Sequence, residues 1–350
     1  MKRAPWFTIR KELTPRQGAI LWLCSFLVPL ALWSAVSYLP FIWHPQVVVT
    51  DPGSVDYFTV GMRGDKPVFV EEVRLAKEEK RAIPHGSPGN PVYLPEPHDV
   101  AKAMYTSYTT PPELATDTWL HQTLWMSLKV IFWGFFLSSL IGVPLGILCG
   151  TVPFFSKLSE PFIEFFRYLP APAFGPLMVA VLGIQQAPKV AIVFIGTFFQ
   201  QVLVIANTTR KLDGSLLEAA QTLGARNKQL VFKVVIPGIV VDLYTDMRIL
   251  LGWAWTYLVI AEVFGTTTGI TFFLTQQSRY FHFAKVYAGI ITIGIIGLTS
   301  DMLLAFVARR IFPWQPQSRS ALGKMFGALL PDRLRRRPAA PVAVPPRLAA

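Results

Sequence analysis

Residues 122–150 read QTLWMSLKVIFWGFFLSSLIGVPLGILCG, and this stretch decides the fold class. Lys129 is its one charged residue, and about 20 apolar residues in a helix are enough to cross the hydrocarbon core of a membrane. The chain of 350 residues is 52% hydrophobic and 15% charged, whereas a soluble domain usually has about 25% charged residues. The sequence therefore excludes a disordered chain, argues against a soluble enzyme and predicts an all-α integral membrane protein.

Five more apolar runs accompany this one, at residues 18–43, 160–184, 189–207, 243–265 and 286–308. The run at 160–184 contains Pro170, Pro172 and Pro176, and proline removes a helical hydrogen bond. We therefore expect this span to be broken or kinked, which membrane helices tolerate where neighbours satisfy the freed backbone groups. Six transmembrane helices are predicted.

The basic residues give the spans a direction. The net charge is +12, yet residues 44–120 are acidic, and the excess of Lys and Arg lies before residue 18, within 208–242 and after 308. Loops on the cytoplasmic side carry such an excess, so we expect both termini and 208–242 inside and 44–118 outside. This pattern explains the basic charge without a nucleic-acid partner and leaves the lipid membrane as the surroundings of the chain.

The domain organisation follows from these boundaries. Two long parts of the chain lie outside the predicted spans. Residues 44–118 are rich in Pro and Gly and include the turn-rich connector AIPHGSPGNPVYLPEP and at most one short exposed helix, around VRLAKEEKR. Residues 99–108 have helical apolar spacing and are expected along the membrane surface. The tail is basic, rich in proline and predicted to be disordered. The predicted parts are a cytoplasmic N-terminus (1–17), a first span (18–43), an extracytoplasmic segment (44–118), a core of five spans (119–311) and a cytoplasmic tail (312–350).

The loop predicted on the cytoplasmic side, residues 208–242, contains the most specific sequence motif of the chain. It reads LLEAAQTLGAR from Leu216 and ends VVIP at Pro237. We expect a short helix, a glycine stop at Gly224, a second short helix and a proline stop at Pro237. Ala219 and Ala220 are small, so another surface can approach the first helix closely.

The spacing resembles the EAA loop of the permeases of ATP-binding-cassette (ABC) importers, namely Glu-Ala-Ala, three residues, Gly, nine residues and Ile-x-Leu-Pro. Val234 and Ile236 are conservative replacements in this pattern. The resemblance implies a type I ABC importer permease fold whose cytoplasmic coupling helices dock into a groove on the ATPase. The residues implied in this coupling are Leu217, Glu218, Ala219, Ala220, Leu223, Gly224, Ala225 and Pro237.

Four further segments, LPEPHDVAKAMYTSY, FIEFFRYLPAPAFGPL, LGWAWTYLVIAEVFG and AGIITIGIIGLTSDMLLAFVARRI, are similar to the nitrate, sulfonate, taurine and bicarbonate type of permease. This resemblance covers Leu94–Ile311 and omits 46–92 and the tail. It implies a bacterial inner-membrane protein that imports a small, often anionic solute. It also implies as partners a second permease, expected to be an identical copy, two ATPase subunits and an extracytoplasmic solute-binding protein.

Enzyme motifs are missing from the sequence. The five histidines form no HxxxH pattern, the two cysteines form no CxxC pair, and there is no GxxxxGK[ST] or GxSxG motif. We therefore expect no catalytic residue, no metal and no cofactor on this chain, with ATP and magnesium bound by a separate ATPase. A secondary transporter or channel without ATPase partners is the main alternative, and a membrane scaffold that recruits a regulator is a more distant one.

Polar residues within spans are functional candidates because they are costly there. The candidates for lining a substrate pathway are Gln200, Gln201, Asn207, Trp253, Trp255, Tyr257 and Glu262, with packing or structural pairing as the alternative role.

Arg248 and Asp301 form a candidate structural ion pair. At 1.5 Å per residue they lie roughly 7.5 Å and 10 Å from the cytoplasmic ends of two antiparallel spans, hence in the same layer of the membrane. Alternatively, Arg248 reaches the lipid headgroups while Asp301 bonds to a neighbouring hydroxyl.

Overall fold

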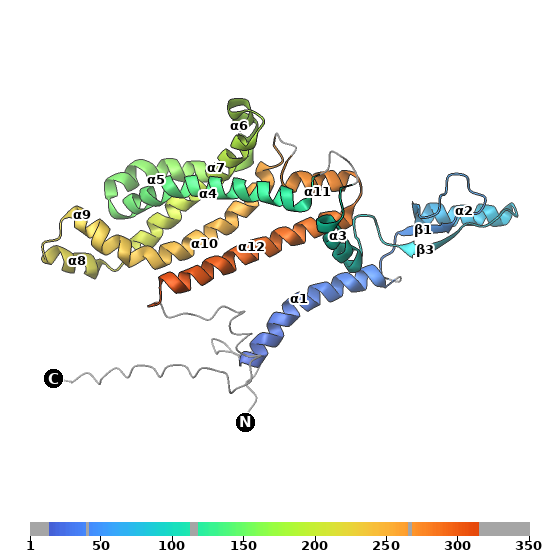
Figure 1. Ribbon diagram of the computed structural model, residues 1–350, viewed down its shortest axis with the longest axis horizontal. Helices are drawn as coiled ribbons and strands as arrows, with labels where there is room; N and C mark the ends of the chain where they lie inside the picture. The colour runs from blue at the N-terminus through green and yellow to red at the C-terminus, as the bar shows by residue number, and fades with distance from the viewer. Residues whose placement is uncertain (1–13, 40–41, 113–117, 265–267, 315–350) are drawn as a thin grey trace, which may run out of the picture. The chain divides into compact units, whose positions relative to one another are not determined.

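A computed structural model describes residues 14–39, 42–112, 118–264 and 268–314. The predictions for the basic residues at the start of the chain and for the proline-rich tail fall outside these ranges. The chain divides into two compact units, one containing α1 (Pro15–Tyr38) and the other formed by Pro40–Gln315 (Figure 1). Thr14 and Gln17 cap α1 reciprocally, with the Thr14 hydroxyl accepting from the Gln17 amide and the Gln17 side chain accepting from the Thr14 amide.

The second unit is largely helical. Its long helices are α4 (Leu120–Thr151), α7 (Gln186–Arg210), α10 (Ile236–Ala261) and α12 (Phe283–Ile311). The shorter helices are α2 (Lys66–Glu78), α3 (Pro97–Thr109), α5 (Pro153–Arg167), the 3₁₀ turn η1 (Ala171–Phe174), α6 (Gly175–Leu182), α8 (Gly214–Thr222), α9 (Asn227–Leu230), the π-helical turn η2 (Val231–Val235) and α11 (Ile270–Arg279). Three strands, β1 (Gln46–Asp51), β2 (Arg63–Asp65) and β3 (His85–Gly89), complete the unit.

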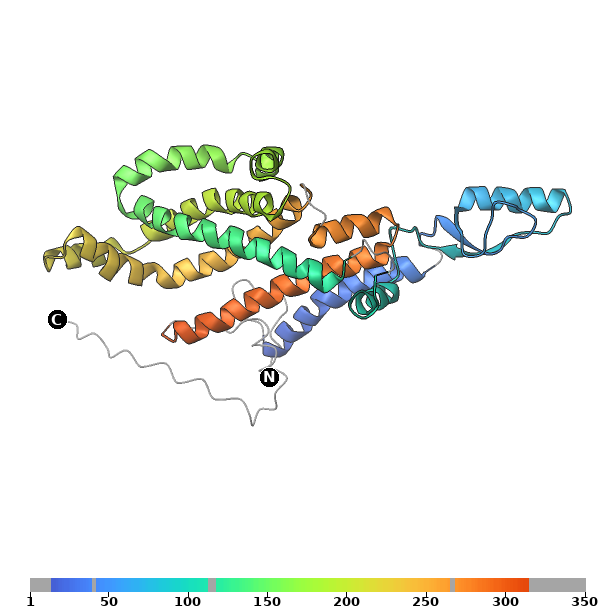
Figure 2. The same ribbon diagram turned by 45° about the horizontal axis from the view of Figure 1, so that its top comes forward.

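Close packing of α4 along α7 forms the centre of the helical part (Figure 2). Every fourth residue of α4 on the contact face is small, and a side chain has no room at Gly134, Gly146 or Gly150. A Cβ atom on Gly134 would lie 2.6 Å from Val193, and one on Gly146 would lie 2.8 Å from Ile205. Small residues let membrane helices approach closely, where dispersion contacts and polar bonds replace the missing hydrophobic driving force.

The helix lengths agree with a protein that crosses a membrane several times. Within the described residues, α1, α4, α7 and α12 are long and apolar enough to span a bilayer, and the pair Pro153–Arg167 and Ala171–Leu182 qualifies as one bent span. The bend of 89° confirms the predicted break at the prolines of the third run. The remaining helix, α10, carries Asp242, Asp246 and Arg248 in its first half, which lowers its hydropathy, so the count of six spans stays a prediction.

The segment predicted as a turn-rich connector contains a small sheet instead. β1 pairs antiparallel with both β2 and β3 in the order β2-β1-β3, and α2 covers the sheet. Val47, Val49, Val55, Phe58 and Phe69 form its own hydrophobic core. The predicted short helix of this segment begins earlier than expected, at Lys66. Among the described residues, the prediction of an all-α fold therefore holds only outside residues 46–89.

Candidate functional site

The hairpin that follows α7 is built from α8, α9 and the start of α10. The Asp213 carboxylate accepts a hydrogen bond of 3.0 Å from the Ser215 amide and caps α8, and this bond holds the pKa of Asp213 below its usual range. At the other end, Gly224 has φ = +84°, the Gly224 amide donates to Gln221 and the Ala225 amide donates to Ala220. This is the Schellman arrangement, so the predicted glycine stop is present in the structure.

Pro237 does not stop a helix, which differs from the expectation. α9, η2 and α10 follow one another without a break, and Pro237 occupies the first turn of α10. Proline is tolerated in a first turn, and a π-helical turn directly before it changes the hydrogen-bond pattern where the proline lacks an N–H.

The outer surface of the hairpin is uncovered. α8 buries none of its side chains, and Leu223 is 89% exposed, which is unusual for a leucine beside a well-ordered helix end. Leu217 faces the opposite way and packs against the cluster around Val235 and Ile239 at the base of α10. A shallow depression beside Leu223 is lined by Ala220, Gly224, Ala225, Gln229 and Lys233. Glu218 and Ala219 are exposed on the same helix, so an apolar side chain, a carboxylate and a depression are presented together.

The candidate pathway residues separate into buried and exposed groups. Gln201 is fully buried, where the Ser138 hydroxyl donates to its carbonyl at 2.6 Å and its amide nitrogen donates to Ser139 at 2.9 Å. Trp255 and Tyr257 are half-buried against the central core, and Gln200 is half-buried on α7. Asn207 is exposed and accepts from Arg210 at 3.2 Å, whereas Trp253 is 49% exposed on α10. The structure thus does not bring these residues onto one surface.

Glu262 is 2% exposed, and its carboxylate binds groups on two helices, α4 and α11. Its carboxylate accepts from the hydroxyl of Ser127 on α4 and from the backbone amide of Thr271 at 2.8 Å, at the N-terminus of α11. The Ser127 oxygen in turn accepts from the Ile270 amide at 2.9 Å. Negative charge is favourable at a helix N-terminus, so Glu262 stabilises the start of α11 and ties it to α4.

Lys189 is a buried neighbour of this cluster. It is fully buried, and its ammonium group donates to the backbone carbonyl of Thr268 at 2.5 Å. The side chain of Gln186 donates to the Thr268 hydroxyl at 3.1 Å. Sequence reasoning missed Lys189 because it stands at the edge of an apolar run, where a lysine is expected to reach water.

The structure brings Arg248 and Asp301 together. The guanidinium donates from Nη2 to both carboxylate oxygens, at 2.8 Å and 2.9 Å, and from Nε to Oδ1 at 3.0 Å. Such a two-pronged contact fixes both charges in one geometry. It links α10 to α12 beside an apolar pocket lined by Phe132, Phe135, Tyr244, Met247 and Leu304.

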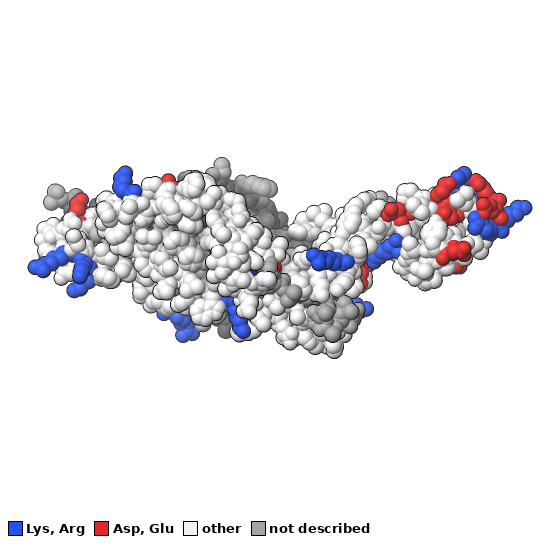
Figure 3. All heavy atoms as spheres, turned by 90° about the horizontal axis from the view of Figure 1, so that it is seen from above, with Lys and Arg blue, Asp and Glu red and all other residues white. Residues whose placement is uncertain are grey.

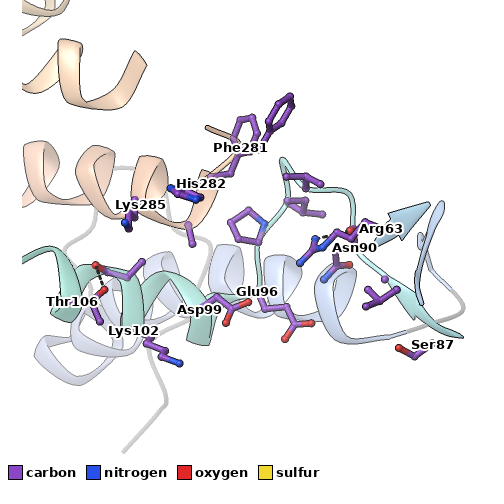
Figure 4. A pocket seen from close by; sticks show the side chains of 18 of the residues that line it. Arg63, Ser87, Asn90, Glu96, Asp99, Lys102, Thr106, Phe281, His282 and Lys285 are labelled. Atoms are coloured by element: carbon purple, nitrogen blue, oxygen red, sulfur yellow. Dashed lines mark hydrogen bonds between the residues drawn. The ribbon is translucent and has the colours of Figure 1, made fainter. Parts of the chain in front are cut away.

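A second pocket, of about 550 Å³, lies between the inserted sheet, α3 and the start of α12. Figure 4 shows Arg63 and Asn90 at one end, His282 and Lys285 at the other, and the first turn of α3 between them.

His98 lies 3.2 Å from Glu96 and 3.4 Å from Asp99, a grouping of metal-ligand type that the sequence did not lead us to expect. These residues come from a PEPHD sequence that indicates only a turn, and they lie at the surface. The space-filling view shows that the inserted segment carries charges of both signs, whereas the helical part has wide uncharged areas (Figure 3).

The bonds of Gln201 give a first testable prediction. Gln201→Leu removes the acceptor of the buried Ser138 hydroxyl, which should cost about 1–3 kcal/mol of stability. The measurement is the unfolding midpoint of the purified protein in detergent. The neighbouring change Gln200→Leu is the control and should leave the midpoint nearly unchanged. An equal effect of the two changes would show that the Ser138–Gln201 contact has no special weight.

The chain matches a known protein family and several of its members. Residues 142–313 match the family described as the binding-protein-dependent transport system inner membrane component. The chain is 31% identical over 227 residues to a Brucella abortus protein named as a probable ABC transporter permease, covering 65% of this chain and 88% of the relative. It is 32% identical to the taurine transport system permease protein TauC of Escherichia coli, covering 64% of this chain and 81% of the relative.

Two further matches are more distant. The chain is 25% identical to the nitrate import permease protein NrtB of Synechocystis, over 63% of this chain and 81% of that protein. A solved structure of the MetNI methionine ABC transporter is similar at 20% identity and a TM-score of 0.48, over 56% of this chain and 96% of that one. The inserted sheet precedes the residues that match the family. With its long apolar helices and the hairpin of α8 and α9, this chain belongs to the ABC importer permeases of the binding-protein-dependent transport systems, and it is a multi-pass membrane transport subunit rather than an enzyme.

Proposed function

We propose that this permease forms the membrane path of an importer composed of two identical permeases, two ATPase subunits and an extracytoplasmic solute-binding protein. The observation that carries this proposal is the hairpin of α8 and α9, whose exposed Leu223, Glu218 and Ala219 offer a docking surface for a partner. ATP and magnesium are bound by the ATPase chains, and this chain needs no cofactor. Leu217, Ala220, Gly224, Ala225 and Pro237 hold the hairpin in shape beneath that surface.

The mechanism is alternating access. ATP binding closes the ATPase dimer, the docked hairpins move, and the α10 helices that continue directly from them rock the two permeases around a central path. The uninterrupted passage from α9 through η2 into α10 supports this, because a continuous helix transmits displacement better than a flexible loop.

The transported solute is proposed to be a small anion or zwitterion of the sulfonate or nitrate class. The similarity to permeases named for taurine and nitrate supports this class. The test is reconstitution of the permease with its ATPase and binding protein in liposomes. ATP hydrolysis stimulated by binding protein loaded with taurine or nitrate supports the proposal. A permease that purifies without stoichiometric ATPase, yet moves solute down an ion gradient, would instead indicate a secondary transporter.

The proposed orientation, in a bacterial cytoplasmic membrane with both termini inside, has its own test. Single cysteines replacing Ser87 on β3 and Ser215 on α8 lie in exposed positions. An impermeant thiol reagent added to intact cells should label the cysteine at 87 and leave the one at 215 unlabelled until the cells are opened. Labelling at 215 without labelling at 87 would reverse the proposed topology.

A further inference from the structure

The pocket between the inserted sheet, α3 and the start of α12 has no role in the transport cycle proposed above. Its volume of about 550 Å³ lies in the range of sites that hold small molecules in proteins. The inserted segment supplies Arg63, Ser87 and Asn90 to its walls, and Phe281 and His282 come from the residues just before α12 (Figure 4). One side of the pocket is therefore built by residues that precede the part of the chain matching the family.

α3 presents a strip of charged and polar side chains to this pocket. Glu96 at the N-cap, Asp99, Lys102 and Thr106 line the pocket and follow one another at three- and four-residue spacing, which places them on one side of the helix. Asp99 and Lys102 are separated by three residues, or roughly 4.5 Å along the helix axis. Side chains of opposite charge thus line the pocket about one helical turn apart.

Glu96 and Asp99 form the acidic end of the strip. An oxygen of one carboxylate lies within 4.8 Å of an oxygen of the other. His98 contacts both carboxylates, but it is exposed and does not line the pocket. Two negative charges this close repel each other, so a cation bound between them from the pocket side is stabilised.

Basic side chains line the rest of the pocket. Lys102 is exposed and forms no ion pair among the described residues, and Lys285 at the start of α12 lines the same cavity. The Arg63 guanidinium is positioned by a bond of 3.0 Å from its Nη1 to the backbone carbonyl of Asn90. Three basic residues against two acidic ones disfavour a bare metal ion and favour a ligand that brings an anionic group together with a cationic one.

From this arrangement we propose that the pocket binds a small zwitterion, an amino group and a sulfonate joined by two carbon atoms as in taurine. The ammonium binds between Glu96 and Asp99, and the sulfonate binds Lys102 and Lys285. The separation of one helical turn between the acidic and basic positions fits the two-carbon spacing. The inference rests on the proposed function for the class of solute, and adds an extracytoplasmic site that holds the solute before it enters the membrane path.

Binding to the full-length permease alone tests this proposal without the ATPase or the solute-binding protein. The permease is placed in nanodiscs of phosphatidylcholine and phosphatidylglycerol and titrated calorimetrically with taurine and with ethanesulfonate, which lacks the amino group. Taurine should bind at least about ten-fold more tightly, because the bonds of its ammonium to two carboxylates are charge-assisted. Equal affinity for the two probes, or no binding of taurine, would overturn the proposal.

Variants of the acidic end assign the ammonium position. Glu96→Gln combined with Asp99→Asn should lower the affinity for taurine about ten-fold, to that of ethanesulfonate, and should not weaken the binding of ethanesulfonate. Asp56→Asn is the matched control, because Asp56 is exposed on the inserted segment and does not line the pocket. It should change neither affinity.

A variant of the basic side assigns the sulfonate position. Lys102→Gln should weaken both probes about ten-fold, since both carry the sulfonate. Lys77→Gln, at an exposed position of α2 outside the pocket lining, is its control and should weaken neither. Wild-type affinity for taurine in both Lys102→Gln and the double variant of Glu96 and Asp99 would place taurine elsewhere on the permease and contradict the proposal.

Two other occupants of the pocket have their own signatures. Zn²⁺ that displaces taurine, and no longer binds in the double variant of Glu96 and Asp99, would make the carboxylates a metal site and overturn the proposal. Phosphatidylethanolamine has a headgroup of the same two-carbon zwitterionic chemistry, so loss of taurine binding in nanodiscs that contain it would assign the pocket to lipid instead. ATP hydrolysis by the assembled complex is measured separately, so failure of the importer assignment and failure of this site are distinguished.

Discussion

Glu218→Arg is expected to leave the permease in the membrane and to abolish its coupling to ATP hydrolysis. Glu218 stands exposed on α8 beside Ala219 and the 89% exposed Leu223, so reversing its charge changes the docking surface and no internal contact of the protomer. Loss of a charged pair at a desolvated interface typically costs 2–5 kcal/mol, which is roughly thirty-fold or more in affinity. The measurement is the amount of ATPase that co-purifies, together with ATP hydrolysis stimulated by the binding protein. Asp56→Arg, a matched charge reversal at an exposed position between β1 and β2, should change neither.

Gly224→Asp should disturb the same docking surface by straining the backbone beside it. With φ = +84° at this residue, a side chain costs about 1 kcal/mol and places a new charge beside Leu223. Gly214→Asp is the matched control, because Gly214 begins α8 in an ordinary helical conformation with no atom within 4 Å of an added Cβ. Normal coupled hydrolysis in both Glu218→Arg and Gly224→Asp would contradict the docking assignment.

The positions of the helices and of their ends along the chain were largely predictable from the sequence. The apolar runs gave the helices, the three prolines gave the bend between α5 and α6, and the Asp213 to Ala225 stretch gave a helix with a glycine stop. These features depend on local chemistry, such as backbone hydrogen bonds lost at proline or left-handed backbone at glycine, which a few neighbouring residues determine.

The orientation of polar residues around a membrane helix was not predictable in the same way. In a helix that is apolar all round, no polar stripe marks which side faces the partner helices. Gln201 is turned toward Ser138 because the small residues of α4 admit α7 closely, and that packing is a tertiary property. Glu262 is likewise placed by α11, a helix that lies between two predicted apolar runs, at 243–265 and 286–308, and belongs to neither.

The inserted sheet escaped prediction for a different reason. β3 reads HGSPG, which lacks β-branched and aromatic residues and contains a proline. Proline is accepted in edge strands, and β3 is an edge strand in the order β2-β1-β3. It forms because the valine-rich β1 offers a partner, so its structure is a consequence of pairing rather than of its own composition.

The ion pair between Arg248 and Asp301 carries the second large prediction. Removing one partner leaves the other charge unpaired on helices that we propose to cross the membrane, where an unpaired charge costs up to about 2.5–3.5 kcal/mol at the helix centre. We expect Arg248→Asp and Asp301→Arg each to reduce the amount of folded permease in the membrane sharply, whereas the double variant should recover much of it because a guanidinium and a carboxylate again face each other. The measurement is the monodisperse fraction of fluorescently tagged permease extracted in mild detergent.

Further variants distinguish an ion pair between Arg248 and Asp301 from the alternative in which Arg248 reaches the lipid headgroups. Arg248→Lys keeps the charge but replaces a planar fork that contacts both carboxylate oxygens by a single ammonium, so a partial loss is expected. Arg248→Leu combined with Asp301→Leu removes both charges together and should be tolerated better than either leucine change alone, since no charge is left unpaired. If Arg248 served only to reach the lipid headgroups, Asp301→Leu alone would be harmless and the charge-swapped double variant would be as defective as Arg248→Asp. That result would show that the contact between α10 and α12 contributes nothing to the stability of the permease.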